Sequence, residues 1–136
     1  VVLVSQYRIS LDVKTIEGAG GRIDKGEAVE KALARELNEE TGIKVEPQAI
    51  TIVFNEYILT SLLNVSAFGG IVKINAKMVK NKKKQDSGNG EHTQVEIFDL
   101  VDLLRKREAG AIKIDLMTSR LLDEVAKATG VLVKKY

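Results

Sequence analysis

Clusters of hydrophobic positions divide the chain into short segments, several of which have the character of β-strands. Runs rich in β-branched and apolar residues predict strands at residues 1–7, 49–59, 64–79 and 93–98. Residues 16–23 contain three glycines and predict a bent strand or loop, because glycine permits close backbone approach. The two middle runs follow each other closely and are expected to pair as a hairpin.

Three other segments carry apolar residues at helical spacing, and they cover residues 27–41, 100–108 and 116–128. The first has the clearest boundaries, because Asp24 and Glu27 form an Asp-x-x-Glu start signal and Gly42 is a stop signal. This order of strands and helices predicts an α+β fold, an α/β/α sandwich, built as a single domain over residues 1–136.

Composition and charge narrow the class of protein. The chain has 136 residues, of which 44% are hydrophobic and 29% charged, as in an ordinary globular domain. Its formal net charge of +2 gives no electrostatic case for duplex nucleic acid or an anionic membrane as an obligatory partner, so nucleic acid is not an expected partner. The absence of cysteine excludes a disulfide framework and a thiol nucleophile, and it fits a cytoplasmic protein. No apolar run approaches the roughly 18 residues of a membrane span, and the start at Val1 without methionine suggests a processed or truncated chain.

The helix predicted at residues 27–41 has glutamates within its apolar face. On a wheel of about 100° per residue, Glu36 and Glu40 fall inside the apolar stripe and Glu39 falls at its edge. Carboxylates this close repel one another, and ionised carboxylates inside a protein are normally paired or bound to metal. Several converging carboxylate oxygens suit a hard divalent cation such as Mg²⁺. The alternatives are a solvated acidic patch and pairing with nearby basic side chains.

The same helix and the loop before it carry a longer motif. Nine positions match the pattern G-x5-E-x7-R-E-U-x-E-E-x-G-U, where U is an aliphatic residue. They are Gly21, Glu27, Arg35, Glu36, Leu37, Glu39, Glu40, Gly42 and Ile43. This pattern resembles the Nudix box with every defined position filled, and nine matches within 23 residues make chance a poor explanation. The resemblance implies a Nudix fold, in which helices flank a mixed β-sheet and a loop-helix-loop binds Mg²⁺ or Mn²⁺.

The resemblance also implies roles for individual residues. The implied metal ligands are Gly20, through its carbonyl oxygen, and the side chains of Glu36, Glu39 and Glu40. Glu39 alternatively positions the attacking water. Glu27 and Arg35 are implied to form a salt bridge that holds the loop against the helix and so supports catalysis.

Residues outside the box resemble one branch of the family, the ADP-ribose and nucleoside-diphosphate-sugar pyrophosphatases. Gln-Tyr-Arg at residues 6–8 and Glu-Gly-Ala-Gly-Gly at residues 17–21 are similar to the Q-Y/F-R and E-L-P-A-G segments of that branch. The resemblance implies that Arg8 contacts the substrate diphosphate and that Glu17 is a substrate-binding residue. The E-L-P-A-G segment has lost its proline and alanine here, and the proline that marks ADP-ribose hydrolases beyond the box is absent, which leaves the substrate open.

A general base is expected outside the helix. By the resemblance, Glu91, on the loop before the strand at residues 93–98, orients or deprotonates the attacking water. Glu39 is the second candidate and Glu96 the third. Alternation along the strand turns Glu96 to solvent if its neighbours Val95 and Ile97 are buried.

The resemblance therefore implies a Mg²⁺-dependent pyrophosphohydrolase. Its expected substrate is a small molecule in which a nucleoside diphosphate is linked to a sugar, of the ADP-ribose, GDP-mannose or UDP-sugar type. Hydrolysis would release a nucleoside monophosphate and a sugar phosphate. The alternatives are a nucleoside-triphosphate or dinucleotide-polyphosphate hydrolase of the same fold, and a Nudix-fold binding module without catalysis. A homodimer is left open.

Overall fold

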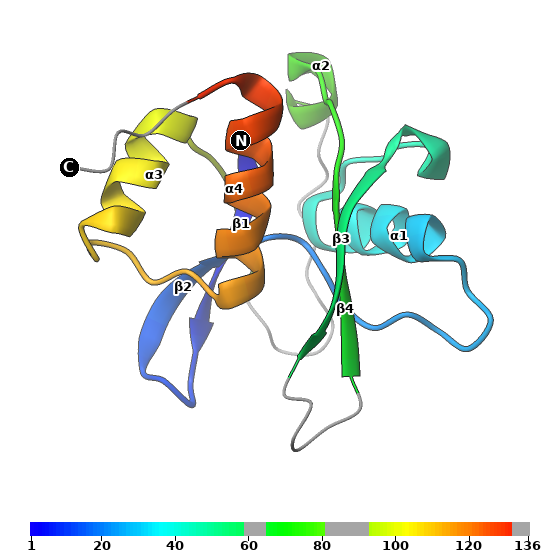
Figure 1. Cartoon of the computed structure of the whole chain (residues 1–136), viewed down its shortest axis with the longest axis horizontal. Coiled ribbons are helices and arrows are strands. Elements are labelled where there is room, and N and C mark those ends of the chain that lie inside the picture. The colour runs from blue at the N-terminus through cyan, green and yellow to red at the C-terminus, as the bar shows by residue number, and fades with distance from the viewer. Residues whose placement is uncertain (59–64, 81–92, 132–136) are drawn as a thin grey trace.

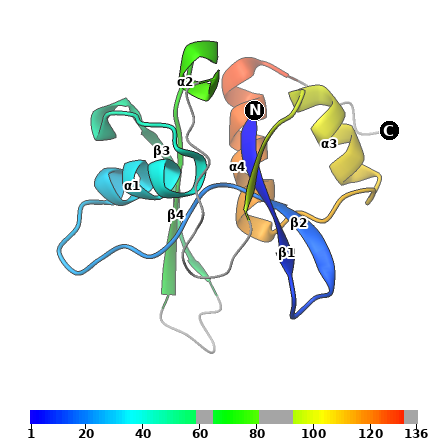
Figure 2. The same ribbon diagram turned by 180° about the vertical axis from the view of Figure 1, so that it is seen from behind.

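A computed structural model describes residues 1–58, 65–80 and 93–131, which form three layers (Figure 1). Helices α3 (Leu100–Glu108) and α4 (Leu116–Thr129) lie on one side of the strands, and helix α1 (Val29–Thr41) lies on the other. The view from behind shows the same order of layers (Figure 2). The α/β/α arrangement expected from the sequence is confirmed. Within the described residues, no helix has the length and apolar content needed to cross a membrane.

Three strands form an antiparallel sheet in the order β2-β1-β5. They are β1 (Val2–Arg8), β2 (Val13–Glu17) and β5 (Gln94–Ile97). Val4, in the central strand, pairs with Glu17 on one side and with Val95 on the other, and it is fully buried. Ile16 of β2 also forms an isolated parallel bridge with Ile114, which ties the sheet to the segment before α4.

Strands β3 (Thr51–Ile58) and β4 (Val65–Ile71) form the hairpin that the sequence predicts. The short 3₁₀ helix η1 (Pro47–Ala49) precedes it and packs against α1. The ring of Phe54 lies directly against the backbone of Gly69, where no Cβ atom fits. Glycine is therefore required at this position by packing across the hairpin.

The strand predicted over residues 64–79 is too long. Strand β4 ends at Ile71, and helix α2 (Ala76–Lys80) occupies the end of the predicted run. The side-chain oxygen of Asn75 accepts hydrogen bonds from the backbone N–H groups of Lys77, at 3.0 Å, and Met78, at 3.1 Å. This local cap satisfies the first amides of a helical turn, so it overrides the β-branched character of the run.

Helix α1 begins two residues later than predicted and ends where predicted. The Glu27 N–H donates to the Asp24 carbonyl at 2.9 Å, and the Asp24 N–H donates to Glu27 Oε2 at 3.0 Å. These bonds close a turn before the helix rather than its first turn. At the other end, Gly42 adopts a left-handed conformation with φ of 70°, which stops the helix. The helices expected at 100–108 and 116–128 are confirmed within one residue.

A leucine core joins the three-stranded sheet to α3 and α4. Leu3 of β1 packs with Leu103, Leu104 and Leu122, each 7% exposed or less. Burial of such a side chain contributes about 1.5–3 kcal/mol to folding. This core fixes α4 against the sheet, and α4 in turn reaches the loop that follows β2.

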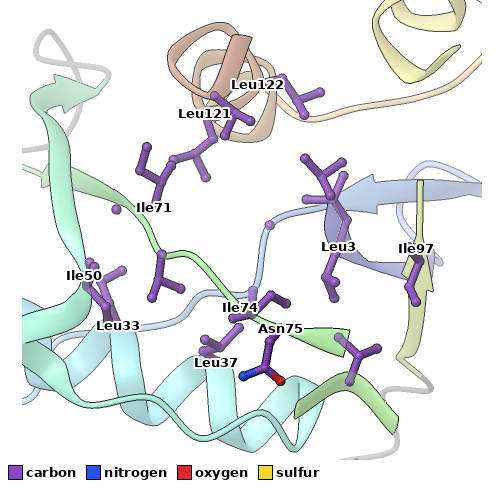
Figure 3. Close-up of a pocket in the computed structure, with 18 of the residues that line it drawn as sticks. Leu3, Leu33, Leu37, Ile50, Ile71, Ile74, Asn75, Ile97, Leu121 and Leu122 are labelled. Carbon is purple, nitrogen blue, oxygen red and sulfur yellow. The ribbon is translucent and has the colours of Figure 1, made fainter. Parts of the chain in front are cut away.

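An apolar cavity of about 580 Å³ lies between α1 and α4 (Figure 3). Leu33 and Leu37 line it from α1, and Leu121 and Leu122 line it from α4. Gly18 and Ala19 of the loop after β2 also belong to its lining. The cavity therefore borders the loop after β2, residues 18–21, which we call the glycine loop.

Candidate active site

Gly20 and Gly21 bring the loop after β2 directly against α1. A Cβ atom at position 21 would fall on the carboxylate of Glu36, so a larger residue there would displace that carboxylate from the loop. The Gly20 N–H donates to Glu40 Oε2 at 3.3 Å. Glu36 and Glu40 are four residues apart and share one face of the helix. The loop backbone and these two carboxylates therefore lie side by side.

Arg35 joins the loop to the helix through its guanidinium group. It donates to both carboxylate oxygens of Glu27, at 3.0 and 2.9 Å, and to the Arg22 carbonyl at 2.9 Å. On α1 it contacts Glu36 at 2.7 Å and Glu39 at 3.2 Å. The structure thus contains the Glu27–Arg35 ion pair and extends it. We call Arg35 with Glu27, Glu36 and Glu39 the helix cluster.

Electrostatic coupling in the helix cluster centres on Arg35. Hydrogen bonds from the Arg35 side chain, followed by one from the Asp24 backbone, lower the pKa of Glu27 to about 2. The pKa of Arg35 rises, chiefly because of its hydrogen bonds to Glu27 and then to Glu36. The Glu36 side chain is only 14% exposed, whereas that of Glu39 is 52% exposed. Glu39 is therefore the member of the cluster that solvent reaches most easily.

The carboxylates on α1 supply the donor atoms that a hard divalent cation prefers. Within residues 1–58, 65–80 and 93–131, no three acidic or histidine side chains are grouped so that they could hold a metal ion as they lie. Arg35 contacts Glu36 and Glu39 and so competes with a cation for their oxygens. Glu36 and Glu40, one turn apart beside the glycine loop, are within reach of a common ligand. The donor set fits Mg²⁺ or Mn²⁺.

A second group of polar side chains lies on β1 and β2, and we call it the strand cluster. Arg8 Nε donates to Glu17 Oε1 at 2.8 Å, and Arg8 Nη2 pairs with the other oxygen of that carboxylate. Gln6, at 3.0 Å, and Thr15, at 2.6 Å, donate to Glu17 as well. The hydrogen bond from Arg8 is the largest cause of the lowered pKa of Glu17. The two expected substrate-binding residues are thus in contact, and the Arg8 side chain is 37% exposed.

Of the general-base candidates, Glu91 lies outside the described residues. Glu39 stands on the exposed side of α1, where Arg35 holds one of its oxygens at 3.2 Å. It is therefore the candidate that the described residues place beside Glu36 and Glu40.

Glu96 is held on the opposite face of the sheet from the strand cluster. Its register partner is Leu3, whose face packs on α3 and α4. The Glu96 carboxylate accepts hydrogen bonds from the Ser5 hydroxyl and from Lys14, at 2.8 Å, and Lys14 is the larger cause of its lowered pKa. The prediction that Glu96 faces solvent depended on the burial of its neighbours Val95 and Ile97. That condition is not met, because Ile97 is 67% exposed. Edge position and ion pairing, rather than simple alternation, set its environment.

One contact that joins the glycine loop to α4 was not predicted from the sequence. The Gly18 N–H donates to the Thr118 hydroxyl oxygen at 2.7 Å, and this hydroxyl donates to the Asp115 carboxylate. Asp115 also caps α4 by accepting from the N–H groups of Met117 and Thr118. The Asp-x-x-Thr pattern signals a helix start, but nothing in it points to a partner 100 residues away.

The structure thus has an α/β/α fold with a loop-helix-loop site. In this site the glycine loop lies against the acidic helix α1, and Arg35 of α1 bonds Glu27 of the preceding loop. Residues 1–117 match the family model described as NUDIX domain. The chain therefore belongs to the NUDIX family, which confirms the family inferred from the box.

Known proteins that are similar to this chain include the following two. One is a methanol dehydrogenase activator of Bacillus methanolicus, 27% identical over 100 residues, which are 74% of this chain and 50% of that protein. The chain thus spans about half the length of this curated relative. The other is the crystal structure of an ADP compounds hydrolase, with a TM-score of 0.63, 18% identity, and coverage of 96% of this chain and 68% of that one. At this identity, the likeness shows a shared fold.

Proposed function

We propose that the chain is a hydrolase that cleaves a nucleoside diphosphate linked to a sugar, releasing a nucleoside monophosphate and a sugar phosphate. Family membership supports hydrolysis of a diphosphate linkage. The name of the structural neighbour, an ADP compounds hydrolase, supports a nucleotide substrate. The observation that carries the proposal is the close fit of Gly21 against the Glu36 carboxylate, beside the Gly20 contact to Glu40.

In this proposal, Glu36, Glu39, Glu40 and the Gly20 carbonyl hold Mg²⁺ or Mn²⁺. A cation held by these groups would neutralise the negative charge that develops on the diphosphate. The acidic helix cannot attract a polyphosphate by itself, because its carboxylates repel phosphate oxygens. A cation at these oxygens removes that repulsion, which is why the proposal requires one.

Other side chains bind and position the reactants. Arg8, partly exposed and oriented by Glu17, binds the diphosphate oxygens. Glu91, the first candidate by the resemblance, orients or deprotonates the attacking water, and Glu39 is the second candidate. Glu27 and Arg35 hold the loop against the helix. The water oxygen bonds to one phosphorus atom as the bridging P–O bond breaks.

A substrate panel tests the proposal. ADP-ribose, GDP-mannose, UDP-glucose and dGTP are incubated with the chain and Mg²⁺ or Mn²⁺, and released phosphates are quantified. We expect nucleoside monophosphate from at least one nucleotide sugar at a rate at least about tenfold above dGTP cleavage, a margin of roughly 1.4 kcal/mol in transition-state binding. Glu36→Gln protein purified in parallel controls for a contaminating hydrolase.

The other outcomes separate the alternatives. Preference for dGTP would identify a nucleoside-triphosphate hydrolase of the same family. Binding of a nucleotide sugar without turnover, with metal bound, would identify a binding module.

A further inference from the structure

We propose that Thr118, on α4, is a positioning residue that sets the glycine loop against the carboxylates of α1. Its side chain is 2% exposed and lies in the first turn of a helix that contributes no carboxylate to the candidate active site. The inference rests on the proposed function, because it assigns Thr118 a role in forming the metal-binding loop.

The hydroxyl of Thr118 is oriented by two partners. It donates its proton to Asp115 Oδ2 and accepts the Gly18 N–H at 2.7 Å. Asp115 is itself fixed, because its other oxygen accepts the N–H groups of Met117, at 2.8 Å, and Thr118, at 3.0 Å. The lone pair that meets Gly18 therefore has a defined direction, which a freely rotating hydroxyl would lack.

Gly18 is also pressed against α4 by packing. A Cβ atom at this position would lie 3.1 Å from Leu121 Cδ1 and 3.7 Å from Thr118 Oγ1. The backbone here therefore rests on the helix surface, and Leu121 is one of the side chains that line the cavity of Figure 3. Position and direction of the chain are set together where it leaves β2.

Two residues further on, the same loop meets α1. Gly20 donates to Glu40 at 3.3 Å, and Gly21 leaves no space between its backbone and Glu36. The loop is thus held at one end by α4 and at the other by α1, which Figure 1 shows on opposite sides of the strands. A shift at Gly18 is transmitted along only two peptide units to Gly20.

Substitutions at Thr118 separate this role from simple helix stability. Thr118→Val keeps the volume and the backbone N–H that Asp115 caps, but it removes the acceptor for Gly18. Thr118→Ser keeps the hydroxyl and removes only a methyl group. Thr118→Ala is the second acceptor-free variant if the valine protein does not fold. Thr129→Val is the matched control, because Thr129 lies on the same helix, is exposed and bonds only within its last turn in the described contacts.

Three measurements are made on each protein: amide hydrogen exchange of residues 17–22 without metal, Mn²⁺ affinity, and kcat and KM on the best substrate of the panel. For Thr118→Val we expect exchange at Gly18 to rise and Mn²⁺ affinity to fall by about fivefold to tenfold, the factor that matches one lost hydrogen bond. We expect kcat to fall with them. Thr118→Ser and Thr129→Val should stay within about twofold of wild type in all three.

The proposal is overturned if Thr118→Val leaves loop exchange and Mn²⁺ affinity unchanged, or if Thr118→Ser loses as much as Thr118→Val. The exchange measurement needs neither metal nor substrate. If the wild type binds no Mn²⁺ and hydrolyses nothing, the proposed function is wrong whatever the exchange data show. If exchange is unchanged in Thr118→Val, the positioning role of Thr118 is wrong whatever the activity.

Discussion

The strand cluster and the helix cluster each contain one arginine, but the strand cluster has one glutamate and the helix cluster has three. In the strand cluster, one carboxylate, that of Glu17, receives hydrogen bonds from Arg8, Gln6 and Thr15. In the helix cluster, one guanidinium, that of Arg35, serves three carboxylates. The single carboxylate of the strand cluster therefore has several hydrogen-bond donors, whereas the helix cluster carries more negative charge than its one arginine can neutralise.

This difference indicates which cluster can accept a cation. Glu17 is 13% exposed and already held by several donors, so a metal ion would have to displace them. On α1, Glu39 is half exposed and bonded to Arg35 through one oxygen. An ion pair between an arginine and a glutamate is therefore informative only together with the count of partners on each side.

The largest effect is expected from Glu36→Gln. Removal of this charge should lower turnover of the best substrate by at least about a hundredfold, the scale found when one charge-stabilising group is lost. Glu30→Gln, which removes a carboxylate from the first turn of the same helix, should keep near-native turnover. Steady-state kinetics in saturating Mg²⁺ checks both. Near-native turnover of Glu36→Gln would show that the helix cluster is not catalytic.

A smaller effect, on binding, is expected from Arg8→Gln. This change should raise KM by about tenfold and change kcat little, because one charged hydrogen-bonding group to phosphate is lost. Glu17→Gln should raise KM less, since Arg8 keeps its charge but loses its bidentate partner. Initial rates over a range of substrate concentrations decide this. Unchanged KM in both variants would make the strand cluster purely structural.

Substitution of Arg35 and substitution of Glu27, the two partners of the loop ion pair, are expected to lower the thermal stability of the protein by different amounts. Arg35→Gln should lower the midpoint of thermal unfolding more than Glu27→Gln, because Arg35 also contacts Glu36, Glu39 and the Arg22 carbonyl. The double variant should be no less stable than Arg35→Gln alone, since the bond between them is then lost only once. Differential scanning fluorimetry without metal measures all three. Strictly additive losses would argue that the two side chains do not interact.

The smallest expected effect is on acid stability. The pKa of Glu27 is lowered from 4.5 to about 2 by Arg35 and the Asp24 amide. Its stabilising contribution is therefore complete above pH 4.5 and is lost as the pH falls from there toward about 2. Denaturant unfolding of wild type and Glu27→Gln should show a stability difference near neutral pH that shrinks over this range. A difference independent of pH would mean that the charge of Glu27 is not responsible.

The features that could be predicted from the sequence are local in the chain. Helix α1, its stop at Gly42 and the nine box positions are all defined by spacing within 23 residues. The Glu27–Arg35 contact also joins two residues that are only eight positions apart in the sequence.

The parts that could not be predicted depend on partners distant in sequence or on single side chains. Thr118 meets Gly18 across 100 residues, and no periodicity encodes that contact. The helix α2 replaces the end of a β-branched run because one asparagine, Asn75, caps it. Likewise, the environment of Glu96 follows from Ser5 on β1 and Lys14 on β2, not from its own strand.

Titration with Mn²⁺ in the absence of substrate shows whether the carboxylates on α1 form a divalent-cation site beside the glycine loop. Wild type, Glu36→Gln, Glu40→Gln and the control Glu30→Gln are compared by calorimetry or by the electron paramagnetic resonance of free Mn²⁺. We expect saturable binding by wild type and Glu30→Gln. The affinity should be at least about tenfold weaker in Glu36→Gln and Glu40→Gln, because each loses one anionic ligand of a hard cation. Equal Mn²⁺ affinity in all four proteins, or no binding by the wild type, would contradict the proposed cation site.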